Sequence, residues 1–152
     1  QDTPDDYVVG TGESHSVREF VETAFLYAGI PIEWQGHGVQ EKGIVASAKG
    51  NYHNLSNGNP CEPPKAGDIV VEIDERYFRP TEVDYLRADI TKAKQQLGWQ
   101  PRVTFADLTK IMVDYDLKMV GIQPPGEGIA ICQDKGFCYT DHAYSFYERI
   151  RQ

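Results

Sequence analysis

The order of local signals near the start of the chain restricts the fold more than any other feature. Residues 7–9 are aromatic or β-branched and predict a short buried strand. After a glycine-containing turn, Ser16 and Glu19 have the spacing of a capping box, which begins a helix. One apolar stripe with helical spacing follows, formed by Val17, Phe20, Val21, Ala24 and Phe25. Gly29 ends the helix and residues 30–34 predict a second strand, so this segment predicts a βαβ unit and an α/β fold.

Further strands and a loop are expected in the middle of the chain. Residues 44–48 and 69–73 have the composition of strands. Between them, residues 51–67 are rich in Asn, Gly and Pro and predict a long loop. The composition changes again after Val120, and we therefore expect residues 1–120 to form one structural part and residues 121–152 a separate tail.

Helical signals dominate the second half. Asp89 is placed to cap a helix over residues 90–97, which a glycine ends. Thr104 begins a longer helix that extends to about Val120. Its predicted core-facing stripe consists of Leu108, Ile111, Met112, Tyr115 and Met119. Residues 143–150 predict a short terminal helix. The βαβ unit is thus followed by a small module of helices and strands.

Composition excludes several classes of function. The chain has 15 basic and 23 acidic residues and a net charge of −8, which disfavours a nucleic-acid or anionic-membrane surface. No apolar run has the length of a membrane span. Three cysteines without a Cys-x-x-Cys motif, together with four scattered histidines, predict neither a disulfide framework nor a metal site. A reducing, cytoplasmic setting is expected. The first residue is not Met, and we expect the chain to be cut from a longer protein.

Two sequence signals for nicotinamide chemistry are incomplete. Gly10 and Gly12 follow a predicted strand, and Glu33 lies about where a dinucleotide fingerprint places its ribose-binding carboxylate. The third glycine position is His15, however, so we interpret both glycines as turn residues without a cofactor role. No Tyr is followed by a Lys at the fourth position, the spacing at which the ammonium lowers the phenol's pKa. We therefore assign no catalytic residue.

The strongest binding signal follows the strand over residues 69–73. Arg79 presents a planar fork of donors that matches phosphate oxygens, and Glu82 lies three residues later, where its carboxylate can accept hydrogen bonds from sugar hydroxyls. Pro80 restricts the backbone between them. Arg76 adds a neighbouring charge. These residues predict a nucleotide-diphosphate site, whereas the alternative interpretation is a solvated ion pair.

Several motifs together resemble the C-terminal half of the GDP-mannose 4,6-dehydratase family. The first is Tyr-Val-Val-x-Thr-Gly-Glu-x-His-Ser-Val-Arg-Glu-Phe-Val over residues 7–21. The most specific is Arg-Tyr-Phe-Arg-Pro-Thr-Glu-Val-Asp over residues 76–84, followed by Lys-Ala-Lys at 92–94 and Leu-Gly-Trp-x-Pro at 97–101. The resemblance extends from Gln1 to about Val120. It does not include residues 121–152, and the loop over residues 51–67 is longer than the family pattern.

The resemblance implies an extended short-chain dehydrogenase/reductase fold. An N-terminal Rossmann half would bind NADP and carry the Tyr/Lys pair upstream of Gln1, and this chain would be the smaller substrate-binding part. Arg79 would bind the diphosphate and Glu82 the ribose of a GDP-sugar, with Arg76 as a weaker candidate. The implied reaction is a lyase step from GDP-mannose to GDP-4-dehydro-6-deoxy-mannose, towards GDP-fucose, in a full-length homo-oligomer.

Two other functions remain open at this point. The first is a non-catalytic nucleotide-binding module, and the second is a truncated product with no activity. As a fragment of the dehydratase the chain is expected to bind GDP-mannose weakly and to be inactive alone, because the cofactor site lies elsewhere. Binding of GDP compared with NADP distinguishes the interpretations.

Overall fold

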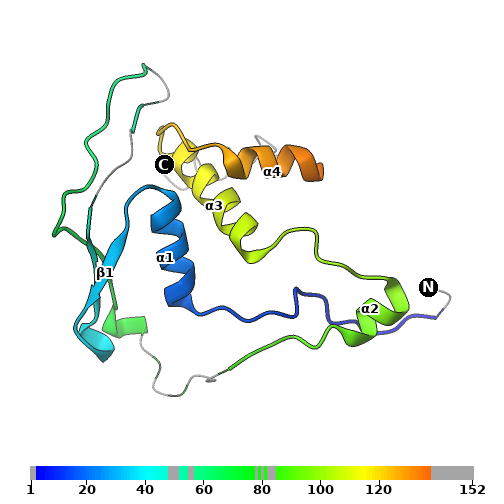
Figure 1. Cartoon of the computed structure of the whole chain (residues 1–152). Helices are drawn as coiled ribbons and strands as arrows, with labels where there is room; N and C mark the ends of the chain where they lie inside the picture. The colour runs from blue at the N-terminus through cyan, green and yellow to red at the C-terminus, as the bar shows by residue number, and fades with distance from the viewer. Residues whose placement is uncertain are drawn as a thin grey trace, which may run out of the picture.

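The computed structural model describes residues 3–47, 52–54, 57–77, 79, 81 and 85–137 of the chain. Its elements, in order, are α1 (Val17–Tyr27), β1 (Ile32–Gln35), η1 (Gly38–Gln40), β2 (Lys42–Val45), β3 (Ile69–Glu72), η2 (Glu75–Tyr77), α2 (Thr91–Leu97), α3 (Phe105–Met119) and α4 (Glu127–Lys135). The chain is therefore a mixed α/β structure in which a small sheet lies beside α1 and the other helices extend away from it (Figure 1).

The sheet is antiparallel, with the order β1-β2-β3. Glu33 pairs with Ile44 across the first pair of strands, and Gly43 pairs with Val71 across the second. A side chain at Gly43 would bring its Cβ to 2.9 Å from the Cβ of Val71, so the close approach of β2 and β3 requires glycine there. Val45 ends β2 and is 2% exposed, which makes it the buried anchor of the sheet.

The predicted βαβ unit is wrong for the described residues. Residues 7–9 are extended but are not part of a strand, and Val8 and Val9 are 55% and 56% exposed. The second predicted strand does form, as β1, but it pairs with β2 and in antiparallel orientation. The side chains of residues 7–9 indicate only that this segment can adopt a strand conformation. A strand also needs a neighbouring strand for its backbone hydrogen bonds, and local sequence does not supply one.

The helix signals are confirmed for α1, for α3 and for the end of α2. The start of α2 differs from the prediction, because Ile90 and not Asp89 is its N-cap residue, although the Asp89 carboxylate accepts the Thr91 N–H at 2.9 Å. The Ser16 hydroxyl accepts the Glu19 backbone N–H at 3.0 Å and begins α1. A complete capping box joins Thr104 and Asp107 at the start of α3, with both bonds at 3.1 Å. Gly98 ends α2 in the left-handed conformation, with a φ of 64°. These elements form where predicted because their caps use residues only a few positions apart.

The N-terminal segment is held along α2 by side chains of that helix and of the residues after it (Figure 1). The Lys92 ammonium binds the Asp5 carboxylate at 2.7 Å and lies 5.0 Å from the centre of the Tyr7 ring. The Tyr7 hydroxyl donates to Gln96 at 3.0 Å, and the Trp99 indole N–H donates to the Gly10 carbonyl at 2.9 Å. This contact brings the turn before α1 next to α2.

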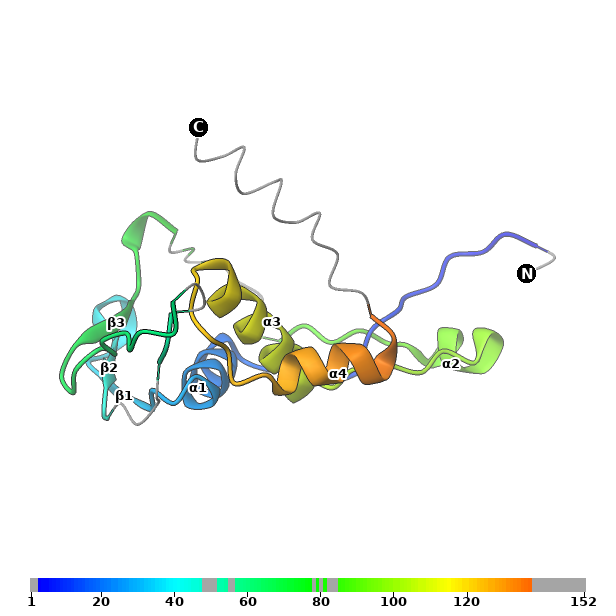
Figure 2. The same cartoon turned by 90° about the horizontal axis from the view of Figure 1, so that it is seen from above.

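Helices α1, α3 and α4 form the second packing region. Helix α3 contacts both α1 and α4, and α4 lies alongside α3 in the two views (Figures 1 and 2). Few apolar side chains are fully buried, and the predicted core stripe of α3 is only partly covered: Leu108 is 50% and Met112 42% exposed. The helix was therefore predicted correctly, whereas its role as a buried core element was not.

Two predictions concern the later part of the chain. The terminal helix expected over residues 143–150 lies outside the described residues. Before it, residues 127–135 form α4 against α3. Within the described residues, every helix is too short or too polar to cross a membrane.

Candidate functional site

The arginines predicted to bind a ligand follow β3. Asp74 begins the η2 turn, because its side chain accepts the Arg76 N–H at 3.0 Å and its carbonyl accepts the Tyr77 N–H at 2.9 Å. The same carboxylate holds the Arg76 guanidinium, with Nε 3.0 Å from Oδ1 and Nη2 2.6 Å from Oδ2. One aspartate therefore shapes the turn and orients the arginine that follows it.

The Arg76 guanidinium is accessible in spite of this ion pair. Its side chain is 81% exposed and lies 5.8 Å from the centre of the Tyr77 ring. The hydrogen bond from Arg76 lowers the pKa of the Asp74 carboxyl, so the pair is charged at neutral pH. Exposed ion pairs are weak in water, and a phosphate carrying more than one negative charge competes well for the same donors.

Arg79 also lies at the surface, three residues after Arg76. Glu82 lies outside the described residues, as do residues 80 and 83–84. The structure therefore does not test whether the Arg79 and Glu82 side chains lie close to each other. The pairing of these two side chains around a nucleotide stays a prediction.

A hollow of about 360 Å³ lies next to this region. It is lined by Val39, Glu41, Lys42, Glu72, Ile73 and Asp74. Each carboxylate at the hollow has a basic partner: Glu72 pairs with Lys42 at 2.9 Å, Asp74 with Arg76 at 2.6 Å, and Glu41 with Arg18 at 2.5 Å. The hollow is thus lined by paired charges.

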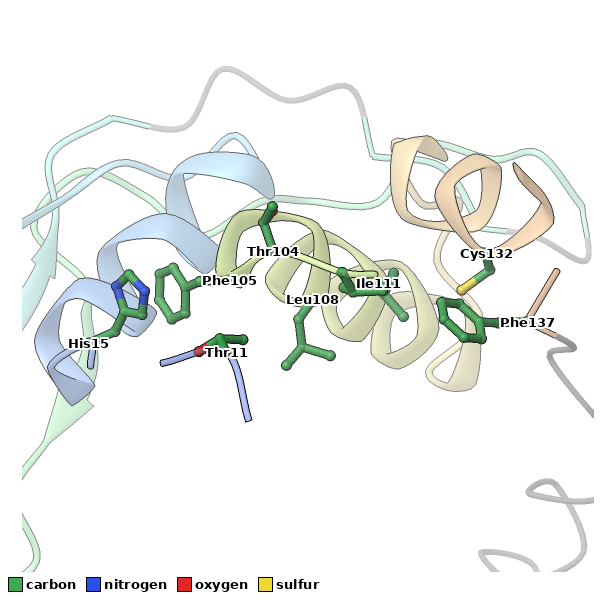
Figure 3. Close-up of a pocket in the computed structure, with 9 residues that line it drawn as sticks. Thr11, His15, Thr104, Phe105, Leu108, Ile111, Cys132 and Phe137 are labelled. Carbon is green, nitrogen blue, oxygen red and sulfur yellow. The ribbon is translucent and has the colours of Figure 1, made fainter. Parts of the chain in front are cut away.

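A separate hollow is apolar. It has a volume of about 550 Å³, and Figure 3 shows its walls, which come from the turn before α1, from α3 and its N-terminal approach, and from α4 and the residue after Gly136. The residues that line it are Thr11, His15, Val103, Thr104, Phe105, Leu108, Ile111, Cys132 and Phe137. Its size is within the range of small-molecule sites, and its polar groups are concentrated at the His15 end (Figure 3).

His15 forms the polar end of this pocket. Its ring stacks on Phe105, with ring centres 3.9 Å apart and planes 10° from parallel (Figure 3). Nδ1 lies 2.9 Å from a Glu19 oxygen and Nε2 3.4 Å from a Glu13 oxygen. The hydrogen bond to Glu19, and then the one to Glu13, raise the pKa of His15. The ring thus joins the start of α1 to the start of α3.

This pocket was not predicted from the sequence. Leu108 and Ile111 were interpreted as core residues because they lie on the apolar stripe of a helix, and the same spacing describes a pocket wall. His15 adjoins Ser16, the N-cap residue of α1, and hydrogen-bonds Glu19 in the first turn. No local signal indicated its contact with Phe105, which lies 90 residues later in the chain.

The turn glycines have packing roles. Gly12 has a φ of 78°, and a Cβ there would lie 3.3 Å from Ile90. A Cβ on Gly10 would lie 3.3 Å from the Ala88 side chain. The segment before them is not a strand in the described residues, so the structural context of a dinucleotide fingerprint is not formed there. No three His, Cys, Asp or Glu side chains gather in a metal-binding arrangement within the part of the chain that the structure describes.

The family model and the similar proteins identify the same family. A sequence model of the family described as GDP-mannose 4,6 dehydratase matches residues 1–112. The chain is 44% identical to a GDP-mannose 4,6-dehydratase of Vibrio cholerae over 119 residues, 78% of this chain and 30% of that protein. It is 42% identical to GDP-mannose 4,6 dehydratase of Homo sapiens over 123 residues, 81% and 28% of the two chains. For a GDP-mannose 4,6-dehydratase of Sinorhizobium fredii the identity is 46% over 117 residues, 77% and 28%. The match thus spans less than a third of these relatives' length.

Proposed function

This chain belongs to the GDP-mannose 4,6-dehydratase family, and we propose that it is the C-terminal, substrate-binding part of such an enzyme. The family match over residues 1–112 carries the proposal. The complete protein would convert GDP-mannose to GDP-4-dehydro-6-deoxy-mannose as an NADP-dependent lyase of the extended short-chain dehydrogenase type. Residues 1–120 would form the substrate part and residues 121–152 a divergent tail.

The proposed substrate contacts are Arg79, Glu82 and Arg76. The two guanidiniums lie at the surface after β3, and charge-assisted bonds from arginine suit a diphosphate. Asp74 keeps the Arg76 fork oriented until phosphate oxygens replace it. Glu82 would bind the ribose hydroxyls.

The extended segment before α1 supports a larger sheet in the complete protein. Residues 7–9 have strand-forming side chains and an extended backbone, and half of the Val8 and Val9 surface is exposed. We propose that they pair with a strand of the NADP-binding part. Strand addition would hydrogen-bond their backbone groups and cover both valines. The catalytic and cofactor-binding groups would lie in that part, which would also contribute to a cytoplasmic homo-oligomer.

Calorimetric titration with GDP tests the proposed site. Arg79→Ala is expected to weaken GDP binding by about tenfold or more, because hydrogen bonds to a charged donor are lost. Lys65→Ala is the matched control. It removes one exposed positive charge from the opposite end of β3, and GDP affinity should not change. If Arg79→Ala binds GDP as tightly as the unchanged chain does, Arg79 does not contact the nucleotide.

Two further measurements separate the alternatives. The chain alone is expected to consume no GDP-mannose, whereas the complete protein consumes it, and turnover by these 152 residues would contradict the proposed division of labour. Tight NADP binding that is lost in Gly12→Val would instead indicate a dinucleotide site at the turn before α1. A chain that binds neither nucleotide would be a product without independent function.

A further inference from the structure

A buried polar cluster joins α1, α3 and the start of α4. The Asp114 carboxylate, fully buried in α3, accepts the backbone N–H of Gly126 at 3.2 Å and that of Ile129 at 3.0 Å. The Tyr27 hydroxyl of α1 donates to the same carboxylate at 2.9 Å and accepts the Glu127 N–H at 3.0 Å. Two side chains from two helices therefore bind the first turn of a third helix.

This cluster replaces a cap that α4 lacks. Gly126 is the N-cap residue and has no side chain to accept a hydrogen bond, so the first N–H groups of α4 need other acceptors. Asp114 and Tyr27 supply them, and a carboxylate is favourable at a helix N-terminus. Burial, and then the bond to Asp114, raise the pKa of Tyr27 to about 12. The phenol therefore keeps its proton at neutral pH and serves as donor and acceptor together.

The remaining contacts of α4 depend on the position that this cluster sets. Gly128 packs directly on the backbone of Lys110, where a side chain does not fit. The Lys110 ammonium also binds the Glu127 carboxylate at 2.5 Å. At the far end, the Arg102 guanidinium donates to the last carbonyl of α4 and lies 4.9 Å from the centre of the Phe137 ring. Helix α4 is thus attached to the α1/α3 body at both ends.

We propose that α4 is a strap, latched by Tyr27 and Asp114, which closes one end of the apolar pocket and lifts from α3 when the latch is broken. Cys132 and Phe137 form the pocket wall on this side (Figure 3). Helix α4 lies beyond residue 112, where the family match ends. The match ends within α3, so Asp114 and α4 both lie beyond it, and Tyr27 is the latch residue inside it.

The accessibility of Cys132 reports the position of the strap. Cys132 is 5% exposed. Cys61 is partly exposed and its backbone N–H bonds to Tyr52, in a segment that contacts the chain before α4 at residues 122 and 123 but is not part of the α3/α4 contact. The rate of alkylation by iodoacetamide at each cysteine can be followed by peptide mass spectrometry in the intact protein. Asp114→Asn places an amide donor among the N–H groups of α4 and should accelerate alkylation of Cys132 about tenfold, with Cys61 unchanged.

Two further variants make the test decisive. Tyr27→Phe keeps the ring and removes only the hydroxyl, and it should accelerate Cys132 alkylation several-fold. Asp116→Asn makes the same charge change at an exposed position of α3 and should leave both cysteines at their original rates. Unchanged Cys132 reactivity in Tyr27→Phe, or equal acceleration of Cys61 and Cys132 in both latch variants, would overturn the proposal. The cluster would then be either unimportant for α4 or a support of the whole fold.

Discussion

The contact between α3 and α4 makes a quantitative prediction about Gly128. A Cβ at this position would overlap the Lys110 carbonyl oxygen and would lie 2.5 Å from the Lys110 carbonyl carbon and 2.6 Å from the Ile111 nitrogen. All three atoms are backbone, so no side-chain rotation relieves the overlap. Ordinary contacts begin at 3.4 Å, and Gly128→Ala therefore requires α4 to move by close to an ångström.

The expected effect of Gly128→Ala has the opposite sign to helix propensity. Replacing glycine by alanine inside a helix normally stabilises it by about 1 kcal/mol. Overpacking against a rigid backbone costs about 1–3 kcal/mol. We therefore expect a net loss of up to about 2 kcal/mol of unfolding free energy, which lowers the urea midpoint by up to about 1 M for a typical dependence on denaturant.

A second substitution in the same helix calibrates the propensity contribution. Ala130 is exposed on α4, so Ala130→Gly changes helix propensity without changing a close contact. It should cost about 1 kcal/mol in the same urea titration. If Gly128→Ala instead stabilises the protein by a similar amount, α4 does not pack on the Lys110 backbone. That result would refute the position of α4 on α3 from which the strap is inferred.

Two other predictions concern the starts of α1 and α3. The pKa of His15 is raised in the folded protein, so protonated His15 stabilises the fold. This contribution is fully present below the unfolded-state pKa near 6.5 and is lost as the pH rises through the folded-state pKa. Unfolding titrations should therefore show the free energy of unfolding falling between these two pKa values. His15→Gln should remove this pH dependence, and its persistence would exclude the contacts of His15 with Glu13 and Glu19 as the cause. Thr104→Ala breaks the capping box of α3 and should cost about 0.5–2 kcal/mol, whereas a change below 0.3 kcal/mol would show that the box does not stabilise the helix.

Predictions from the sequence succeeded where the controlling interaction is local. The caps of α1 and α3 join residues three positions apart, and the αL glycine that ends α2 follows the last residue of that helix. The family motifs over residues 7–21 and 76–101 are contiguous strings, and the family match confirmed the resemblance that they indicated. The assignment of Arg79, Glu82 and Arg76 as substrate contacts is based on the same strings and stays a prediction.

Predictions failed where a contact between distant segments decides the outcome. Residues 7–9 have the side chains of a strand, but sheet formation depends on a partner strand that the local pattern does not specify. The apolar stripe of α3 has the predicted helical spacing. This spacing does not show whether another element covers the apolar face of the helix, and Leu108 is 50% exposed at a pocket. His15 meets Phe105 only because α1 packs on α3.

The sequence by itself therefore determined helices α1, α2 and α3 and the family, because these depend on residues within a few positions of one another. It did not predict α4, which lies in the segment expected to be a separate tail. The tertiary structure alone decided that the strands are antiparallel, that an apolar pocket lies between the start of α1 and α4, and that α4 is latched to the body. The latch joins Tyr27 to Asp114, 87 positions apart, and a buried carboxylate is stable there only because three helices bring their hydrogen-bonding groups to the same point.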